Sequence, residues 1–202
     1  MLAFCKRFGV PFAAFVLALN LAGCGINTIP TEEERAKAAW SEVLNQYQRR
    51  SDLIPNLVET VKGYAAQERE IFIQVAEARA KVGEIKIDPS ILTDPEAFKR
   101  FQELQAQLAG ALSRLLAVSE RYPDLKSSQN FLALQSQLEG TENRIAVARR
   151  DYIEAVRVYN TELKTFPGII WANVLYRNNK PMETFTIDEP TTKPPVVIFD
   201  KK

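Results

Sequence analysis

Two stretches of the sequence carry polar residues that could do chemistry between packed helices. The first contributes Arg50, Asp52, Asn56 and Glu59, and the second contributes Asn130, Glu142, Asn143, Arg144, Arg149 and Asp151. This set could form a groove that binds a partner, or interhelical hydrogen bonds that fix helix register. A carboxylate pair such as Glu59 with Glu142 could also serve acid–base chemistry or hold a hard cation. We favour hydrogen bonds that fix register over a binding groove. Acid–base or cation chemistry is the least favoured, because neither a nucleophile nor a pocket accompanies these carboxylates.

The chain contains no histidine, which excludes several classes of site. Histidine general bases, Ser–His and Cys–His nucleophile pairs and His-ligated zinc are ruled out. The di-iron sites of helix bundles need Glu-x-x-His pairs, which this sequence lacks. We therefore predict a protein that is not an enzyme and has no cofactor, metal or small-molecule substrate. A carboxylate-dependent hydrolase or a cation-binding protein is the least favoured alternative.

Cys24 has the most specific chemistry of any residue in the chain. It ends the run Leu21-Ala22-Gly23-Cys24, which resembles a bacterial lipobox. In such a motif the small residues admit the peptidase and the thiol accepts a diacylglyceryl group. Several acyl chains, each contributing about 0.8 kcal/mol per buried CH₂, make a durable anchor. We predict lipidation at Cys24, and we interpret Cys5, which no small residues precede, as an ordinary apolar residue.

The residues before Cys24 have the three parts of a secretory signal. A basic pair, Lys6 and Arg7, precedes an apolar run from Phe8 to Leu19 and the small-residue site. The run is shorter than the roughly 20 residues of a spanning helix. We predict a signal peptide over 1–23 and a tether over 24–30, with an uncleaved N-terminal membrane helix as the open alternative. Gly25 resembles the residue that follows the cysteine in outer-membrane lipoproteins, so we expect the periplasmic face of the outer membrane.

The charge balance argues against two kinds of partner. Without Lys6 and Arg7, 24 basic side chains face 25 acidic ones, a net charge of −1. A nucleic-acid-binding protein is expected to carry a basic stripe, so we predict no nucleic-acid partner. The same balance gives no general attraction to anionic lipid headgroups.

Apolar periodicity predicts long helices through most of the chain. Thr31 can cap a helix that continues past Pro55 to about residue 76, either as one kinked helix or as two. A loop over 83–95 precedes the helix start Asp94-Pro95-Glu96. Apolar residues then alternate at spacings of three and four, first at Phe101, Leu104, Leu108, Ala111, Leu115, Val118 and Tyr122, then at Phe131, Leu134, Leu138, Thr141, Ile145, Ala148, Tyr152, Ala155 and Tyr159. This pattern is typical of packed, nearly antiparallel helices.

The segment after Phe166-Pro167-Gly168 has a different character. Residues 169–175 are apolar and are expected to form a short helix that covers one end of the bundle or touches lipid. Beyond them, four prolines between 181 and 195 predict an extended tail. The domains expected are therefore a helical bundle over 31–168 and a C-terminal tail over 169–202.

Two motifs resemble the LemA family. The first runs from Gln48 to Ala65 and is followed by Glu68, and the second begins Tyr122-Pro123-Asp124-Leu125-Lys126 and continues through residues 129–131, 142–146, 148–152 and 159–160 to Phe166-Pro167. The similarity extends over about residues 36–168. It implies an all-α fold, an elongated antiparallel bundle of four long helices, but no established reaction, cofactor or ligand. Many family members look anchored by an N-terminal transmembrane helix, whereas this sequence has a lipobox.

We therefore expect a membrane-tethered cell-envelope protein that acts as an interaction or scaffold module. Its expected partners are the membrane, through a lipid anchor or an N-terminal helix, and another envelope protein. A passive structural spacer of the envelope is the alternative that needs no protein partner.

Overall fold

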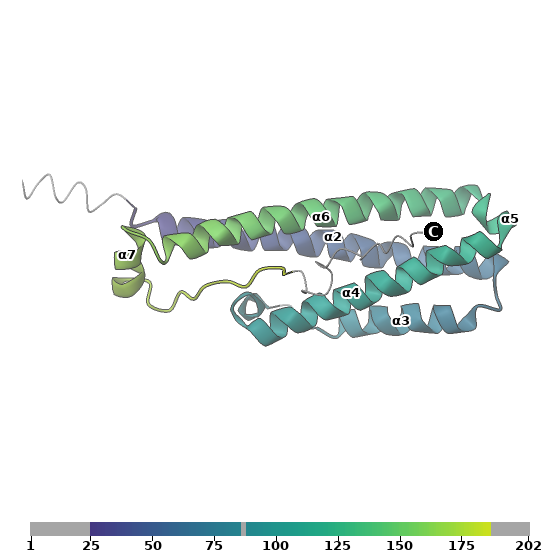
Figure 1. Ribbon diagram of the computed structural model, residues 1–202, viewed down its shortest axis with the longest axis horizontal. Helices are drawn as coiled ribbons and strands as arrows, with labels where there is room; N and C mark the ends of the chain where they lie inside the picture. Colours follow the sequence, from purple (N-terminus) through teal and green to yellow (C-terminus); the bar gives the residue numbers. More distant parts are fainter. Residues whose placement is uncertain (1–24, 86–87, 187–202) are drawn as a thin grey trace, which may run out of the picture.

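A computed structural model describes residues 25–85 and 88–186, and the described elements are all helical (Figure 1). This confirms the predicted all-α class. Cys24, the predicted signal peptide and residues 187–202 lie outside the described residues. None of the helices in the described part of the chain is long and apolar enough to cross a bilayer.

The first long helix, α2 (Thr28–Tyr64), passes through Pro55 without ending. No helix boundary lies at Pro55, but the predicted continuation to about residue 76 was wrong, because α2 ends at Tyr64 and residues 69–83 form a separate helix. Pro55 is exposed, so its ring lies away from the packed side of the helix. The predicted start was wrong: α2 begins three residues before Thr31, and Asn27 at the N-cap makes no side-chain hydrogen bond.

Because α2 begins at Thr28, the carboxylates of Glu33 and Glu34 lie beyond its first turn. There they bind Lys37, whose Nζ is 2.7 Å from Glu33 Oε1 and 2.9 Å from Glu34 Oε1. The hydrogen bonds to Glu33 and Glu34 raise the pKa of Lys37 to about 12. Most of this pair network is solvent-exposed, so its contribution to stability is small.

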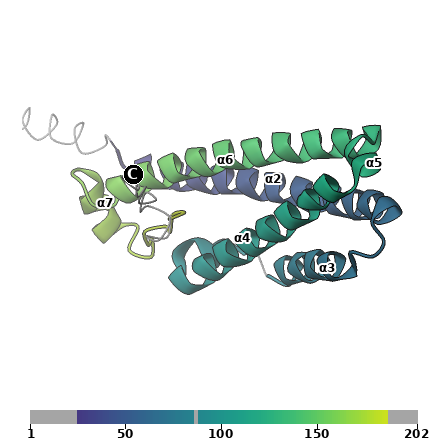
Figure 2. The same cartoon turned by 45° about the vertical axis from the view of Figure 1, so that its right-hand side comes forward.

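After α2 the chain reverses and forms two further helices that lie side by side. Helix α3 (Arg69–Gly83) is followed by the 3₁₀ helix η1 (Pro89–Thr93) and by α4 (Pro95–Ala117), and α3 lies beside α4 (Figures 1 and 2). The predicted cap of α4 is confirmed, because the Asp94 carboxylate accepts hydrogen bonds from the backbone N–H groups of Glu96 and Ala97, each at 3.1 Å.

The two predicted caps should differ in their contribution to stability. Asp94→Ala leaves two N–H groups of α4 without their acceptor, so we expect the free energy of unfolding to fall by about 1 kcal/mol. Thr31 lies inside α2 and caps nothing, so Thr31→Ala should change the free energy of unfolding by less than about 0.5 kcal/mol. Urea unfolding followed by circular dichroism measures both, and equal losses would contradict the assigned cap.

The chain turns again through η2 (Val118–Arg121) and the short helix α5 (Pro123–Lys126) before α6 (Gln129–Glu162). Pro123, which lies between the two predicted apolar stripes, opens this short helix, and the next long helix begins only at residue 129. Helix α6 is about 50 Å long at 1.5 Å per residue. It runs antiparallel to α2 along most of its length, and α7 (Gly168–Val174) lies at the end where α2 begins (Figure 1).

The heptad positions of α6 form its packed side. Its buried residues are Phe131, Leu138, Thr141, Ile145, Ala148, Tyr152, Ala155, Val156 and Tyr159. All but Val156 belong to the predicted stripe, which is confirmed except that Leu134 is only half-buried. The apolar repeat therefore identified the side of α6 that meets α2.

The core has two parts, one toward each end of the molecule. The part toward α5 is aliphatic, with Leu57, Leu108, Leu115 and Leu125 among its members. The part toward α7 is aromatic, and Trp40 packs against the rings of Phe98, Phe101, Tyr152 and Phe185 at centroid distances of 5.2–6.1 Å.

Residues 180–186, which we call the C-terminal strap, form neither helix nor turn and enter the aromatic part of the core. Met182 and Phe185 are buried there. The strap is held on one side by the Glu183 N–H, which donates to Leu92 O at 2.7 Å, and by Gln102 Nε2, which donates to Thr186 O. On the side of α6 it is held by Tyr152 Oη, Tyr159 Oη and Asn160, which bind Glu183 O, Lys180 O and both backbone polar groups of Met182.

Tyr152 makes stability depend on alkaline pH. Burial raises the pKa of its phenol well above the ordinary value. Unfolded tyrosine ionises near pH 10, so above that pH the unfolded chain loses a proton that the folded chain keeps, and stability falls as pH rises. For Tyr152→Phe we expect a loss of about 1 kcal/mol at pH 7, from the hydrogen bond to Glu183.

Above pH 10 the same variant should lose stability less steeply, by up to about 1.4 kcal/mol per pH unit. Burial also raises the pKa values of Tyr47 and Tyr159, so part of the alkaline loss should remain. Urea unfolding at intervals from pH 7 to 11 measures the difference. Parallel stability curves for the two proteins would contradict an important role for Tyr152 ionisation.

Candidate functional site

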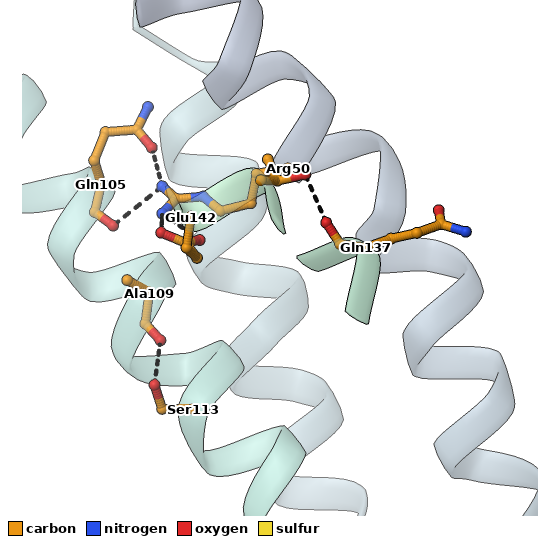
Figure 3. A network of polar contacts seen from close by, with 7 residues as sticks. Arg50, Gln105, Ala109, Ser113, Gln137 and Glu142 are labelled. Atoms are coloured by element: carbon orange, nitrogen blue, oxygen red, sulfur yellow. Dashed lines mark hydrogen bonds and ion pairs between the residues drawn. The ribbon is translucent and has the colours of Figure 1, made fainter. Parts of the chain in front are cut away.

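Arg50 lies in the middle of α2 and is the most deeply buried charged residue in the described chain, with 2% of its surface exposed. Its Nη1 donates to Glu142 of α6, with distances of 3.1 Å to Oε1 and 3.4 Å to Oε2. Its Nη2 donates to the side-chain and backbone oxygens of Gln105 in α4. Figure 3 shows the guanidinium between these two residues. One side chain thus links three helices.

The aromatic ring of Tyr47 completes the surroundings of Arg50. The guanidinium carbon lies 5.0 Å from the ring centroid, within range of a cation–π interaction. Burial raises the pKa of Tyr47, and the charges of Arg149 and Arg50 oppose that rise. Tyr47 therefore stays neutral at physiological pH and presents its ring to the cation.

Glu142 connects this buried site to solvent. Its side chain is 42% exposed, whereas that of Arg50 is 3% exposed. It borders a groove of about 430 Å³ between α4 and α6, which we call the α4–α6 groove, lined by Ala109, Leu112, Ser113, Leu116, Leu138, Glu139, Glu142 and Asn143. Its accessible apolar surface comes from Ala109 and Leu116, which are half-buried, because Leu112 and Leu138 belong to the core. Two carboxylates, an amide and a hydroxyl supply polar groups.

A second groove, of about 640 Å³, lies between α2 and α3 and shares Tyr47 and Gln105 with the surroundings of Arg50. It also includes Ser51, whose hydroxyl accepts a hydrogen bond from Arg79 Nε at 3.4 Å. The surroundings of Arg50 thus border both grooves: Glu142 lines the first, and Tyr47 and Gln105 line the second.

Of the ten predicted polar residues, the structure joins two across helices, Arg50 and Glu142. Asp52 accepts from Gln48 of its own helix, Glu59 pairs with Lys62, Asp151 pairs with Arg150, Arg144 donates to Thr141 at 3.5 Å, and the Asn56 carbonyl accepts from Thr60. Arg149 lies 4.3 Å from the ring centroid of Phe185 in the C-terminal strap. Asn130 and Asn143 are exposed.

The sequence interpretation missed Gln105. It is 5% exposed and supplies two of the acceptors of Arg50. The carboxylate pair considered for acid–base or cation chemistry is not assembled, because Glu59 pairs with Lys62 and Glu142 binds Arg50. Among the described residues, no group of three or more Asp, Glu, Cys or His side chains could hold a metal ion.

Residues 39–199 match the model of the LemA family. Magnetosome proteins MamQ 1 and MamQ 2 of Paramagnetospirillum magneticum are each 31% identical to the chain over 157 residues, which cover 70% of this chain and 58% of theirs. Protein LemA of Metamycoplasma hominis is 24% identical over 147 residues, 73% of this chain and 61% of that protein. The chain therefore spans less than two thirds of the length of these curated relatives.

Proposed function

The chain belongs to the LemA family, and from this premise we propose that it is a non-catalytic, membrane-tethered envelope protein. In this proposal it acts as a scaffold: an elongated four-helix bundle presents the α4–α6 groove to another envelope protein. The tether is a lipidated Cys24 that follows a cleaved signal peptide. The body then projects from the periplasmic face of a membrane, with the outer membrane favoured over the inner one.

The observation that carries the proposal is the α4–α6 groove itself. Its partly exposed apolar side chains, Ala109 and Leu116, can contact an apolar side chain of a partner, while Glu139 and Glu142 at its border favour a partner with basic side chains. The ion pair with Arg50 neutralises part of the Glu142 charge, but the Glu142 carboxylate stays partly exposed. The groove thus keeps a fixed shape and an acidic border without needing a bound ligand.

Photochemical crosslinking in intact cells can test the groove. A photoreactive amino acid at Asn143, which is exposed beside the groove, should give one discrete adduct with another envelope protein. Ser113→Arg should abolish the adduct, because the long side chain fills the groove and its cation neutralises the acidic border.

Ser41→Arg is the matched control for this experiment. Both serines are exposed on a helix, and each hydroxyl donates at 3.0 Å to the carbonyl four residues earlier. Only Ser113 lies in the groove, so Ser41→Arg should leave the adduct unchanged. A smear of adducts, or equal loss in both variants, would overturn the groove as the binding surface.

The tether is tested separately through the mass of Cys24→Ala beside the unchanged protein, each after membrane fractionation. We expect a mature species that begins at Cys24 and carries acyl chains, and we expect this species to be absent from the variant. An unprocessed chain of 22.8 kDa in the membrane for both proteins would mean that an N-terminal membrane helix holds the protein.

The length of the paired helices α2 and α6 favours a second candidate, a passive spacer of the envelope. A spacer depends on its length and not on its groove. Removal of matched heptads from the long helices should then alter function in the cell, while Ser113→Arg should be silent. The reverse pattern supports the interaction module.

A further inference from the structure

Helix α7 has an apolar outer face in the described structure. Its exposed side chains, with their flanks, are Phe166 (80%), Ile169 (39%), Ile170 (46%), Val174 (56%) and Leu175 (54%), which we call the α7 face. The opposite side of the helix is used in packing, because Trp171 and Ala172 contact the aromatic part of the core. Clustered exposed apolar residues of this kind mark a surface that meets another apolar body.

The α7 face lies at the point where the chain emerges from its predicted anchor. The Cβ position of Gly25 is 3.5 Å from Pro167 Cγ, and Tyr176 Oη donates to Ile26 O at 3.0 Å. Cys24, the anchor residue of the proposed function, directly precedes Gly25 in the sequence. Whether the anchor is acyl chains or an uncleaved helix, it holds the α7 end of the bundle at the membrane surface.

The residues around the α7 face suit a lipid interface better than a second protein copy. Lys164 and Arg177 are exposed on either side of it, and their long side chains can reach headgroup phosphates while the apolar residues enter the acyl boundary. The chain has no excess of positive charge, so burial of apolar surface must supply most of the attraction.

We propose that the α7 face is a second membrane contact, which inserts into the lipid interface beside the N-terminal anchor and sets the bundle at a fixed orientation. This inference rests on the membrane tether of the proposed function. With one attachment point alone the bundle could pivot about Cys24. With two attachment points, the long axis of the bundle keeps a fixed angle to the bilayer, and the α4–α6 groove lies at a fixed distance from the membrane surface.

A photoreactive amino acid at Ile170 of the full chain, in the membranes of the expressing cells, tests the contact. We expect a phospholipid adduct, identified by its mass. The same amino acid at Leu132, which is 49% exposed near the opposite end of α6, should give none. An adduct at 170 with a second copy of the chain or with another protein, or no adduct there, would overturn the proposal.

A paired substitution sharpens the test. In a chain with the photoreactive group at Phe166, Ile170→Asp with Val174→Asp should lower the yield of lipid adduct by about tenfold or more, because two charges oppose insertion. Ile73→Asp with Val147→Asp, at positions 51% and 47% exposed, should leave the yield unchanged. Equal yields in the two variants would overturn the proposal.

Fractionation of the same samples separates this inference from the tether. A chain that sediments with membranes but gives no lipid adduct at 170 keeps its tether and lacks the second contact. A chain that is absent from the membrane fraction has no tether, and both proposals then fail.

Discussion

Arg50→Ala is expected to lower the free energy of unfolding by about 2–4 kcal/mol. The side chain is 2% exposed, so its removal leaves a cavity among α2, α4 and α6. It also leaves the buried side-chain oxygen of Gln105 without its donor. Glu142 is expected to contribute less to the loss, because its carboxylate is partly exposed and water can solvate it once the guanidinium is gone.

Arg49→Ala is the natural control, since the neighbouring arginine is exposed. We expect it to change the free energy of unfolding by less than about 0.5 kcal/mol. The double variant Arg50→Met with Gln105→Leu should recover much of the loss, because apolar groups then replace both buried polar partners. Urea unfolding of the four proteins decides the matter. If Arg50→Ala were as stable as Arg49→Ala, the three-helix contact would contribute nothing to the fold.

The case of Gln105 shows where the sequence pattern stops being informative. In α4 the predicted apolar stripe ran through Leu104, yet the structure buries Gln105 and leaves Leu104 half-exposed. The other predicted positions of α4 are buried as expected, and residues 104 and 105 both border that side, so periodicity alone favours the more apolar of the two. The buried glutamine becomes favourable only because Arg50, from a helix 55 residues earlier in the chain, reaches it. The residues near Gln105 in the sequence therefore give no sign that it is buried.

Helix α6 shows the opposite case. Apart from two tyrosine hydroxyls that bind the strap, its stripe from Phe131 to Tyr159 holds one polar side chain, Thr141. Its hydroxyl donates to the carbonyl of Gln137 at 2.8 Å and so needs no partner on another helix. No competing stripe exists, and the prediction held along the whole helix apart from Leu134. Local periodicity is sufficient where a helix satisfies its own polar groups.

The position of the C-terminal strap could not be predicted from the sequence, for a different reason. Its residues have no period, and their hydrogen bonds go to groups up to 91 residues away in sequence, as in the contact between Glu183 and Leu92. The prolines that follow predicted an extended chain, but nothing in them indicated that Met182 and Phe185 enter the core. An extended segment can fill a cavity only when other elements have formed it, and here α2, α4 and α6 do so.

Phe185→Ala should therefore have an effect as large as that of a substitution in a helix core. The ring contacts Trp40, Phe98 and Tyr152, and Arg149 lies 4.3 Å above it. Truncation of a buried phenylalanine typically costs about 3–5 kcal/mol, and loss of the cation–π contact adds about 0.5–1 kcal/mol. Since the strap follows the last helix, it can detach while the helices remain folded, and the measured loss is limited by the cost of that local release.

Phe166→Ala is the matched control, since that ring is 80% exposed, and it should change the free energy of unfolding by less than about 0.5 kcal/mol. Hydrogen exchange can separate release of the strap from unfolding of the whole chain. In Phe185→Ala the Glu183 amide, which donates to Leu92, should exchange much faster, while amides in the middle of α6 exchange at a rate set by global stability. Equal acceleration at both places would mean that the strap and the helices unfold as one unit. Unchanged exchange at Glu183 would mean that the Phe185 ring does not hold the strap in place.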